Sequence, residues 1–302
     1  ELIWKMPKRL GGALNYKWLM LTRMGEGLFR YIQPRGFERF LHGAGRPMRD
    51  AMLAGVQAVA TRQDRLGELG LQPRGRFEDI ARSSVSLTTD GFFAKVRAKT
   101  IAVHRDAVIT ALGAQDGRPV ARLSDGFTVR ADVVACGTGF DQRVPFLDPE
   151  LQRRLTDERG NFVLYRQIEP LDVPRLSFSG YNSSFFSPLS AEIAALWIAN
   201  LLMGGMTLPP VAEQRAHVDA RLRWMEERTR GHHARGTNVI PFSMHNVDEM
   251  LEDIGVEVGR ATRLTQWLLP IDPGAYRMVT ERLLERKAHV EVKARAPAMQ
   301  RA

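Results

Sequence analysis

The sequence feature that most constrains the fold is the stretch Asp132-Val133-Val134-Ala135-Cys136-Gly137-Thr138-Gly139-Phe140. A charged residue, four small or apolar residues and two glycines around a threonine predict a buried strand that ends in a tight turn. Glycine tolerates positive φ and lets foreign atoms approach the backbone, and open α/β sheets bind ligands at the carboxyl ends of their strands. The stretch therefore predicts a turn that a ligand can approach, although an ordinary strand-to-loop turn would have the same sequence.

The neighbouring segments form a pattern around this turn. The pair Asp125-Gly126 predicts a hairpin that runs into the same strand. Residues 174–181 predict a second apolar strand, and residues 189–203 have the composition of a helix. This order resembles the carboxyl-terminal half of the flavin-containing monooxygenase family, whose D-x-V-V-x-A-T-G-[YF] turn links the NADPH and FAD domains. Gly137 stands here where that family has alanine.

Other segments that are similar to the family occur in the expected order. They are Trp4-Lys5-Met6-Pro7-Lys8, the run from Tyr16 to Phe29, the segment from Arg74 to Ile80, and the stretch from Asn246 through Tyr276. The resemblance implies an α/β fold with the FAD/NAD(P)-binding architecture of two dinucleotide-binding domains. It assigns residues 1–140 to the end of an NADP(H)-binding domain, with a helical insertion and a strand meander. It assigns residues 141–302 to the end of an FAD-binding domain with a helical tail.

The resemblance also implies an activity. In the family, NADPH reduces FAD, O2 forms a C4a-(hydro)peroxyflavin, and one oxygen atom passes to a small organic substrate by N- or S-oxygenation or a Baeyer–Villiger reaction. The flavin carries this chemistry, while the protein supplies orientation, electrostatics and exclusion of water. A cluster of catalytic side chains is therefore not expected, and catalytic residues stay unassigned.

The segment Gly180-Tyr181-Asn182-Ser183-Ser184-Phe185-Phe186-Ser187-Pro188-Leu189 is the strongest candidate for contact with the flavin. Ser187 is a suitable N-cap for the next helix, with Pro188 at the first helical position. A helix start presents free N–H groups and positive potential, which suit the electron-rich N1/O2 edge of a reduced flavin. An ordinary capped helix would also fit. The cofactor contacts that we expect are Asn182, Ser183, Ser187 and Leu189, together with Gly137, Thr138 and Gly139.

A Rossmann dinucleotide site needs Gly-x-Gly-x-x-Gly after a strand and at the start of a helix, where bare backbone amides meet the pyrophosphate. The one partial match, Gly43-Ala44-Gly45, lies between helical segments and has Met48 at the third position. By the resemblance, both fingerprints would precede Glu1. We therefore expect an architecture that is incomplete at its amino terminus and a fragment that is inactive alone. A degenerate, cofactor-free homologue that acts as a binding scaffold is the alternative.

Composition and charge bear on three further questions, namely nucleic-acid binding, membrane insertion and the role of the cysteine. The net charge of +9 suggests nucleic-acid binding as a hypothesis. However, the arginines are dispersed among carboxylates and no nucleic-acid module occurs. We therefore expect no nucleic-acid partner, and a basic binding protein with salt-sensitive retention is a third hypothesis. The longest apolar run, residues 189–206, contains Glu192 and Asn200, which predicts a buried helix and no membrane span. The single Cys136 fits a reducing, cytoplasmic compartment, and its apolar strand predicts inert packing.

The histidines and serines have weaker patterns. Adjacent His232 and His233 point apart on any regular element, so we expect an exposed loop and no metal site. His104, His217 and His245 are isolated in the sequence. The serine-rich run before the predicted helix lacks a Gly-x-Ser-x-Gly elbow, so a hydrolase triad is not expected.

Helices are predicted where apolar residues recur with helical spacing. Residues 46–66 predict an amphipathic helix with Met48, Met52, Val56 and Val59 on one side. Further helices are expected over residues 13–33 with breaks at two glycines, 151–155, 212–230 and 248–254. Short strands are expected over residues 85–87, 101–103, 108–112, 120–123, 129–135 and 162–165.

Overall fold

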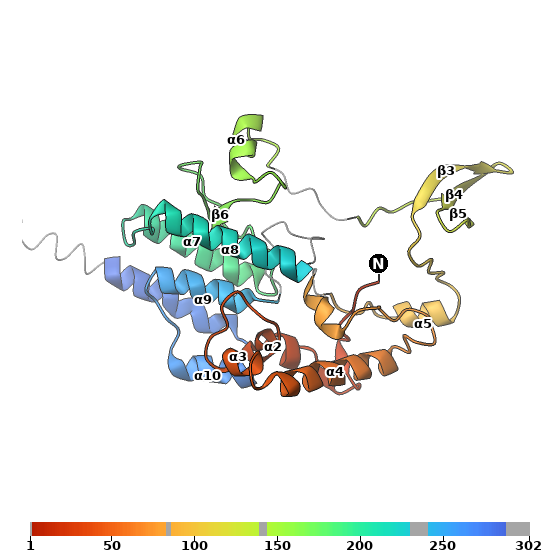
Figure 1. The fold of residues 1–302 in the computed structure, drawn as a ribbon, viewed down its shortest axis with the longest axis horizontal. Helices are drawn as coiled ribbons and strands as arrows, with labels where there is room; N and C mark the ends of the chain where they lie inside the picture. Colours follow the sequence, from red (N-terminus) through yellow and green to blue (C-terminus); the bar gives the residue numbers. More distant parts are fainter. Residues whose placement is uncertain (1, 83–85, 139–143, 230–240, 288–302) are drawn as a thin grey trace, which may run out of the picture.

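The structure is a computed structural model that describes residues 2–82, 86–138, 144–229 and 241–287 (Figure 1). Its helices are α1 (Lys17–Met20), α2 (Arg23–Gly27), α3 (Phe37–Leu41), α4 (Arg46–Gln63), α5 (Phe92–Arg97), α6 (Pro149–Leu155), α7 (Ser187–Leu202), α8 (Val211–Thr229), α9 (Ser243–Asp253) and α10 (Arg260–Leu268). Two 3-10 turns are η1 (Phe77–Arg82) and η2 (Pro273–Tyr276), and residues 277–287 are also helical. None of the described helices is both long and apolar enough to cross a membrane.

The named strands of the described residues all pair antiparallel. They are β1 (Arg9–Leu10) with β2 (Leu14–Asn15), the meander β3 (Ile109–Gln115), β4 (Arg118–Leu123) and β5 (Thr128–Arg130), and β6 (Leu164–Tyr165) with β7 (Glu169–Pro170). One isolated parallel bridge joins Met6 to Leu87. The chain therefore contains both helices and strands, and its longest strands form the meander.

Two Asp-Gly pairs make the turns of the meander. Asp116 and Gly117, between β3 and β4, both have positive φ, which two-residue hairpin turns require. At the second turn, Gly126 has positive φ and the Asp125 carboxylate accepts a hydrogen bond from the Phe127 N–H at 3.1 Å. The predicted hairpin is confirmed. In Figure 1 the meander stands apart from the helices, and every residue of β3 is exposed.

The predicted buried strand after this hairpin is not formed. β5 ends at Arg130, residues 133–138 have no regular structure, and Val133 is 86% exposed. A strand persists only where its backbone groups find a neighbouring strand, and the ladder between β4 and β5 ends at the pair Val120–Arg130, close to the start of β4. The prediction that Cys136 packs inertly is wrong for the same reason, since its side chain is exposed.

Residues 174–181 also differ from the prediction, because they contain no strand. Phe178 instead donates its backbone N–H to the Ile168 carbonyl at 2.8 Å, and its ring packs in a small apolar cluster. The helix predicted over residues 13–33 forms only as the two short helices α1 and α2. Residues 101–103 likewise form no strand.

The helices predicted from periodicity are confirmed in α4, α6, α7, α8 and α9, but the face that α4 buries differs. Met48, Met52 and Val59 are exposed by 44%, 37% and 39%, whereas Arg49, Leu53 and Ala60 are buried. These two stripes are one residue apart, about 100° around a helix. Arg49 can lie inside because its Nε donates to the Leu28 carbonyl at 2.7 Å and its guanidinium pairs with Glu78.

Three apolar clusters hold the described residues together. The largest joins α7 and α9 to parts of α8 and to residues 256–283, with Trp197 and Val247 fully buried. The second surrounds Trp4 and includes Phe242, which directly precedes α9. The third is small and packs against α6. Phe185, just before α7, packs against both larger clusters, so the N-termini of α7 and α9 lie where these two cores meet.

Candidate functional site

The predicted contact residues before α7 lie at this junction. The N-cap of α7 is Phe186, so the prediction that Ser187 caps the helix is wrong. The Ser187 hydroxyl instead accepts from the Ser184 N–H at 3.1 Å and donates to the Ser184 carbonyl at 2.8 Å. Pro188 is the second residue of α7, one position later than predicted, and the Leu189 side chain is buried in the largest core.

The first turn of α7 has no side-chain acceptor from the residues that the structure describes. Phe186 makes no capping hydrogen bond, and Ser187 uses its hydroxyl on the preceding loop. Uncapped N–H groups and the helix dipole give this end positive potential. An electron-rich group can be stabilised here.

Asn182 supplies a second polar feature next to this helix start. Its Nδ2 donates to Gln167 Oε1 at 3.4 Å. Its Oδ1 is buried and finds no hydrogen-bond partner among the residues that the structure describes. A buried acceptor without a partner costs free energy, and a ligand N–H could satisfy it. The neighbouring Ser183 is exposed.

Buried serines connect the start of α7 to the start of α9. Phe185 donates its N–H to Ser243 Oγ at 3.0 Å, and the hydroxyls of Ser184 and Ser190 lie 3.4 Å apart. Ser190 and Ser243 are completely buried. Asn246, one turn along α9, is also completely buried, and both atoms of its amide lack a partner in the described part of the chain. The interface of α7 and α9 is therefore polar at its N-terminal end and apolar beyond.

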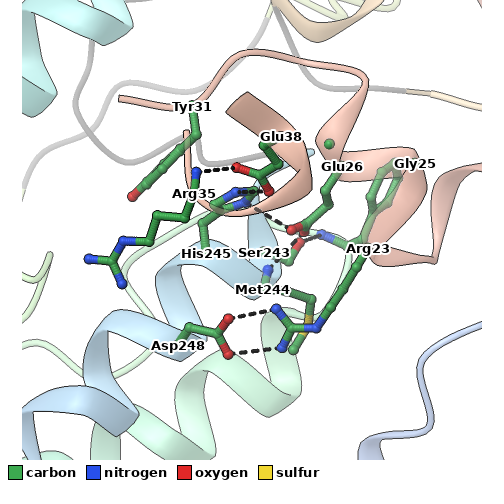
Figure 2. Close-up of polar contacts among 12 residues, drawn as sticks. Arg23, Gly25, Glu26, Tyr31, Arg35, Glu38, Ser243, Met244, His245 and Asp248 are labelled. Carbon is green, nitrogen blue, oxygen red and sulfur yellow. Dashed lines mark hydrogen bonds and ion pairs between the residues drawn. The ribbon is translucent and has the colours of Figure 1, made fainter. Parts of the chain in front are cut away.

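A carboxylate from α2 caps α9 (Figure 2). Glu26 Oε1 accepts from the Met244 N–H at 2.8 Å, while its Oε2 lies 3.0 Å from His245 Nδ1. The other imidazole nitrogen, Nε2, lies 2.7 Å from Glu38 Oε1 on α3. A carboxylate at a helix N-terminus is stabilised by the dipole and by the orphan N–H groups. The structure thus joins α2, α3 and α9 through a single imidazole.

This environment decides the charge of the imidazole. Burial opposes the charged ring, but hydrogen bonds to Glu26 and Glu38 outweigh it and raise the pKa of His245 to about 10. Burial likewise opposes ionisation of Glu38, and the His245 hydrogen bond and charge still lower the pKa of that carboxyl. At neutral pH both ring nitrogens therefore donate, and His245 serves as a fixed cation.

Further ion pairs lie beside this imidazole on α9. Arg23 donates to both oxygens of Asp248 at 2.6 and 2.9 Å, as Figure 2 shows, and its Nε donates to Gln266 at 2.9 Å. Glu249 accepts from the Tyr31 hydroxyl at 2.7 Å and from Arg221 at 2.5 Å. Burial opposes the charge of Glu249, yet its cationic neighbours lower the pKa of the carboxyl to about 2. These groups are matched with one another, so they fix the scaffold around the site.

The glycine turn predicted as the other half of the site lies elsewhere. Gly137 and Thr138 are exposed, and Gly139 lies outside the described residues. Among the described residues, no hydrogen bond joins Gly137 or Thr138 to the segment before α7. His232 and His233 also lie outside the described residues. The described part of the chain contains no group of three or more His, Cys, Asp or Glu residues that could hold a metal ion.

No sequence pattern indicated Glu26, Glu38, Ser243 or Asn246, and His245 is isolated in the sequence. The two carboxylates are separated from His245 by 219 and 207 residues. Spacing rules extend over a few residues, so no local signal could have joined them.

No protein-family model matches the chain. Its sequence is 27% identical over 223 residues to a probable flavin-containing monooxygenase 1 of Arabidopsis thaliana, covering 72% of this chain and 40% of the relative. It is 29% identical over 199 residues to a putative flavin-containing monooxygenase 2 of the same plant, covering 64% of this chain and 41% of the relative. The chain thus spans about two fifths of the length of these relatives.

A solved S-allyl-L-cysteine S-oxygenase from Allium sativum is 22% identical. The match covers 58% of this chain and 41% of the S-oxygenase chain. Its TM-score of 0.40 is too low to establish a shared fold. The relationship rests on the sequence matches.

Proposed function

Because this chain is similar in sequence to flavin-containing monooxygenases, we propose that it acts as the carboxyl-terminal portion of an FAD- and NADPH-dependent monooxygenase. Its reaction transfers one oxygen atom from O2 to a small organic substrate. The observation that carries the proposal is the sequence match over 72% of the chain. Residues 1–140 belong to the NADP(H)-binding domain and residues 141–302 to the FAD-binding domain, in an architecture of two dinucleotide-binding domains.

The geometry before α7 fits a flavin. An isoalloxazine ring has an N–H donor and, nearby, electron-rich carbonyl and ring-nitrogen acceptors. The buried Asn182 Oδ1 can accept from the donor, and the uncapped first turn of α7 suits the acceptors. Ser187 shapes the loop that presents Asn182, and Leu189 anchors it in the core. Ser183 is exposed in the same loop and would be open to a ligand.

The protein's own contribution is to bind, orient and keep water away. A bound FAD supplies the activation of O2 after reduction by NADPH. Phe186 and Leu189 are buried beside the helix start, so they form an apolar wall that excludes water. Glu26 and His245 hold the N-terminus of α9 against this segment. The turn at Gly137, Thr138 and Gly139 would let the chain cross between the two domains.

One observation favours the alternative of a cofactor-free scaffold. The segment that should carry the glycine turn has no strand, and Gly137 is exposed. A homologue that kept the helical core but lost this strand would bind a partner without flavin.

The test is to purify the gene product that contains this chain and to measure bound flavin and substrate-stimulated NADPH oxidation. Asn182→Ala removes one hydrogen bond to a buried acceptor, so we expect about tenfold weaker flavin binding. Asn15→Ala is the control, because the one side-chain hydrogen bond of Asn15 within the described residues is local, from the Lys17 N–H to Asn15 Oδ1 at 3.0 Å. Flavin-free protein without NADPH oxidation would overturn the function. Equal flavin affinity in wild type and Asn182→Ala would remove Asn182 from the site.

A further inference from the structure

A cavity of about 980 Å³ opens between η1, α8 and the segment that contains Phe29 and Tyr31. Its volume falls in the range of small-molecule sites, about 300–1,000 Å³. Six arginines line it, namely Arg30, Arg74, Arg76, Arg82, Arg223 and Arg228. It lies apart from the segment before α7, none of whose residues lines it.

The acidic residues in the wall do not balance these arginines. The wall contains three acidic residues. Of these, Glu78 already pairs with the buried Arg49, and Asp79 pairs with Arg82 at 2.5 Å. Within the described part of the chain, the side chains of Arg76 and Arg223 make neither a hydrogen bond nor an ion pair. The cavity therefore carries excess positive charge, which attracts anions.

Aromatic rings form part of the same wall. The ring of Trp224 lies 5.2 Å from Tyr31 and 4.8 Å from Phe242, measured between centroids. The Trp224 indole donates to the Arg30 carbonyl at 3.0 Å, which fixes the ring in place. The Arg228 guanidinium lies 4.9 Å from the Trp224 ring, and burial lowers its pKa to about 10, so it remains a cation at neutral pH.

We propose that this cavity binds a small organic oxyanion that carries an aromatic ring. Guanidinium groups bind carboxylate and phosphate oxygens in bidentate geometry, and the Trp224 wall packs against a planar ring. The wall is ordered before binding, because Tyr31 is held by Glu249 and Arg221, so little entropy is lost. The proposal goes beyond the monooxygenase function and does not depend on flavin.

Titration calorimetry of the full chain at 150 mM salt tests it with phenyl phosphate, inorganic phosphate and benzoate. Phenyl phosphate combines a dianion with a ring, so it should bind at least about tenfold more tightly than inorganic phosphate. Whichever of phenyl phosphate and benzoate binds more tightly identifies the preferred oxyanion. Binding of neither would overturn the proposal.

Three variants locate the binding. The double variant Arg76→Gln/Arg223→Gln should weaken binding of the aromatic oxyanion at least about tenfold. Arg62→Gln, on the exposed face of α4 away from the cavity, should leave it unchanged. Trp224→Leu should weaken the binding of phenyl phosphate and leave the binding of inorganic phosphate unchanged. Equal affinity in wild type and the double variant, with folding confirmed by a thermal melt, would contradict the proposal.

Discussion

A single imidazole joins two carboxylates that reach α9 from α2 and α3. Glu26 and Glu38 are both buried, and His245 is their common partner. Removing one member of a buried ionic group leaves the remaining charges uncompensated, which costs more than the intact arrangement contributes. The stability of this part of the fold therefore depends on one side chain.

His245→Leu should lower the free energy of unfolding by about 3–5 kcal/mol, measured by urea denaturation. His104→Leu is the matched control, because His104, which precedes β3, pairs at 2.9 Å with Asp125 in the turn between β4 and β5, where both side chains are partly exposed. Its loss should cost less than about 1 kcal/mol. Adding Glu38→Gln to His245→Leu should recover part of the loss, since one buried charge disappears. Equal losses for the two histidine variants would show that the buried imidazole carries no special role.

At the level of an element, two helical glycines have opposite surroundings. A Cβ on Gly25 in α2 would lie 1.7 Å from the Leu19 carbonyl oxygen, whereas a Cβ on Gly55 in α4 would meet nothing within 4 Å. α2 can thus follow α1 closely only because residue 25 has no side chain.

Gly25→Ala should therefore destabilise the protein by more than about 2 kcal/mol, because the backbone must shift. Gly55→Ala should stabilise it by about 0.5–1 kcal/mol through helix propensity. Thermal melts of the two single variants distinguish these outcomes. If Gly25→Ala melted at or above the wild-type temperature, the close approach of α1 and α2 would be refuted.

The segment after β5 offers another element-scale test. Cys136 is exposed there, in a stretch without regular structure. A thiol that a thiol-specific reagent modified only after urea denaturation would contradict this exposure and support the buried strand that the sequence predicts.

For the whole molecule, buried charges make stability depend on pH. The pKa of His245 is raised from 6.5 to about 10 on folding. Its contribution to stability is therefore fully present below pH 6.5 and is lost as pH rises through about 10. The expected slope is about −1.4 kcal/mol per pH unit between these values.

Urea denaturation at intervals from pH 6.5 to 10 measures this slope. His245→Leu should remove it, which separates His245 from the other groups that titrate in the range. A wild-type stability that stayed constant over these pH values would contradict the charged imidazole.

Local features of the sequence determined much of the element content. Apolar periodicity located α4, α6, α7 and α8, two Asp-Gly pairs formed the turns of the meander, and the order of short segments indicated the relationship to flavin-containing monooxygenases. Each of these signals acts over a few residues, because helix spacing and turn conformation are local properties. These helices and turns could therefore be predicted from the sequence alone.

Only the tertiary structure decided which groups are buried and which of them meet. α4 buries Arg49 because the Leu28 carbonyl and Glu78 accept its guanidinium hydrogen bonds. Residues 133–138 form no strand because none of the described strands lies beside them. His245 becomes a fixed cation because Glu26 and Glu38 arrive from more than 200 residues away. Burial and hydrogen-bond pairing depend on neighbours in space, and no spacing rule along the chain specifies those neighbours.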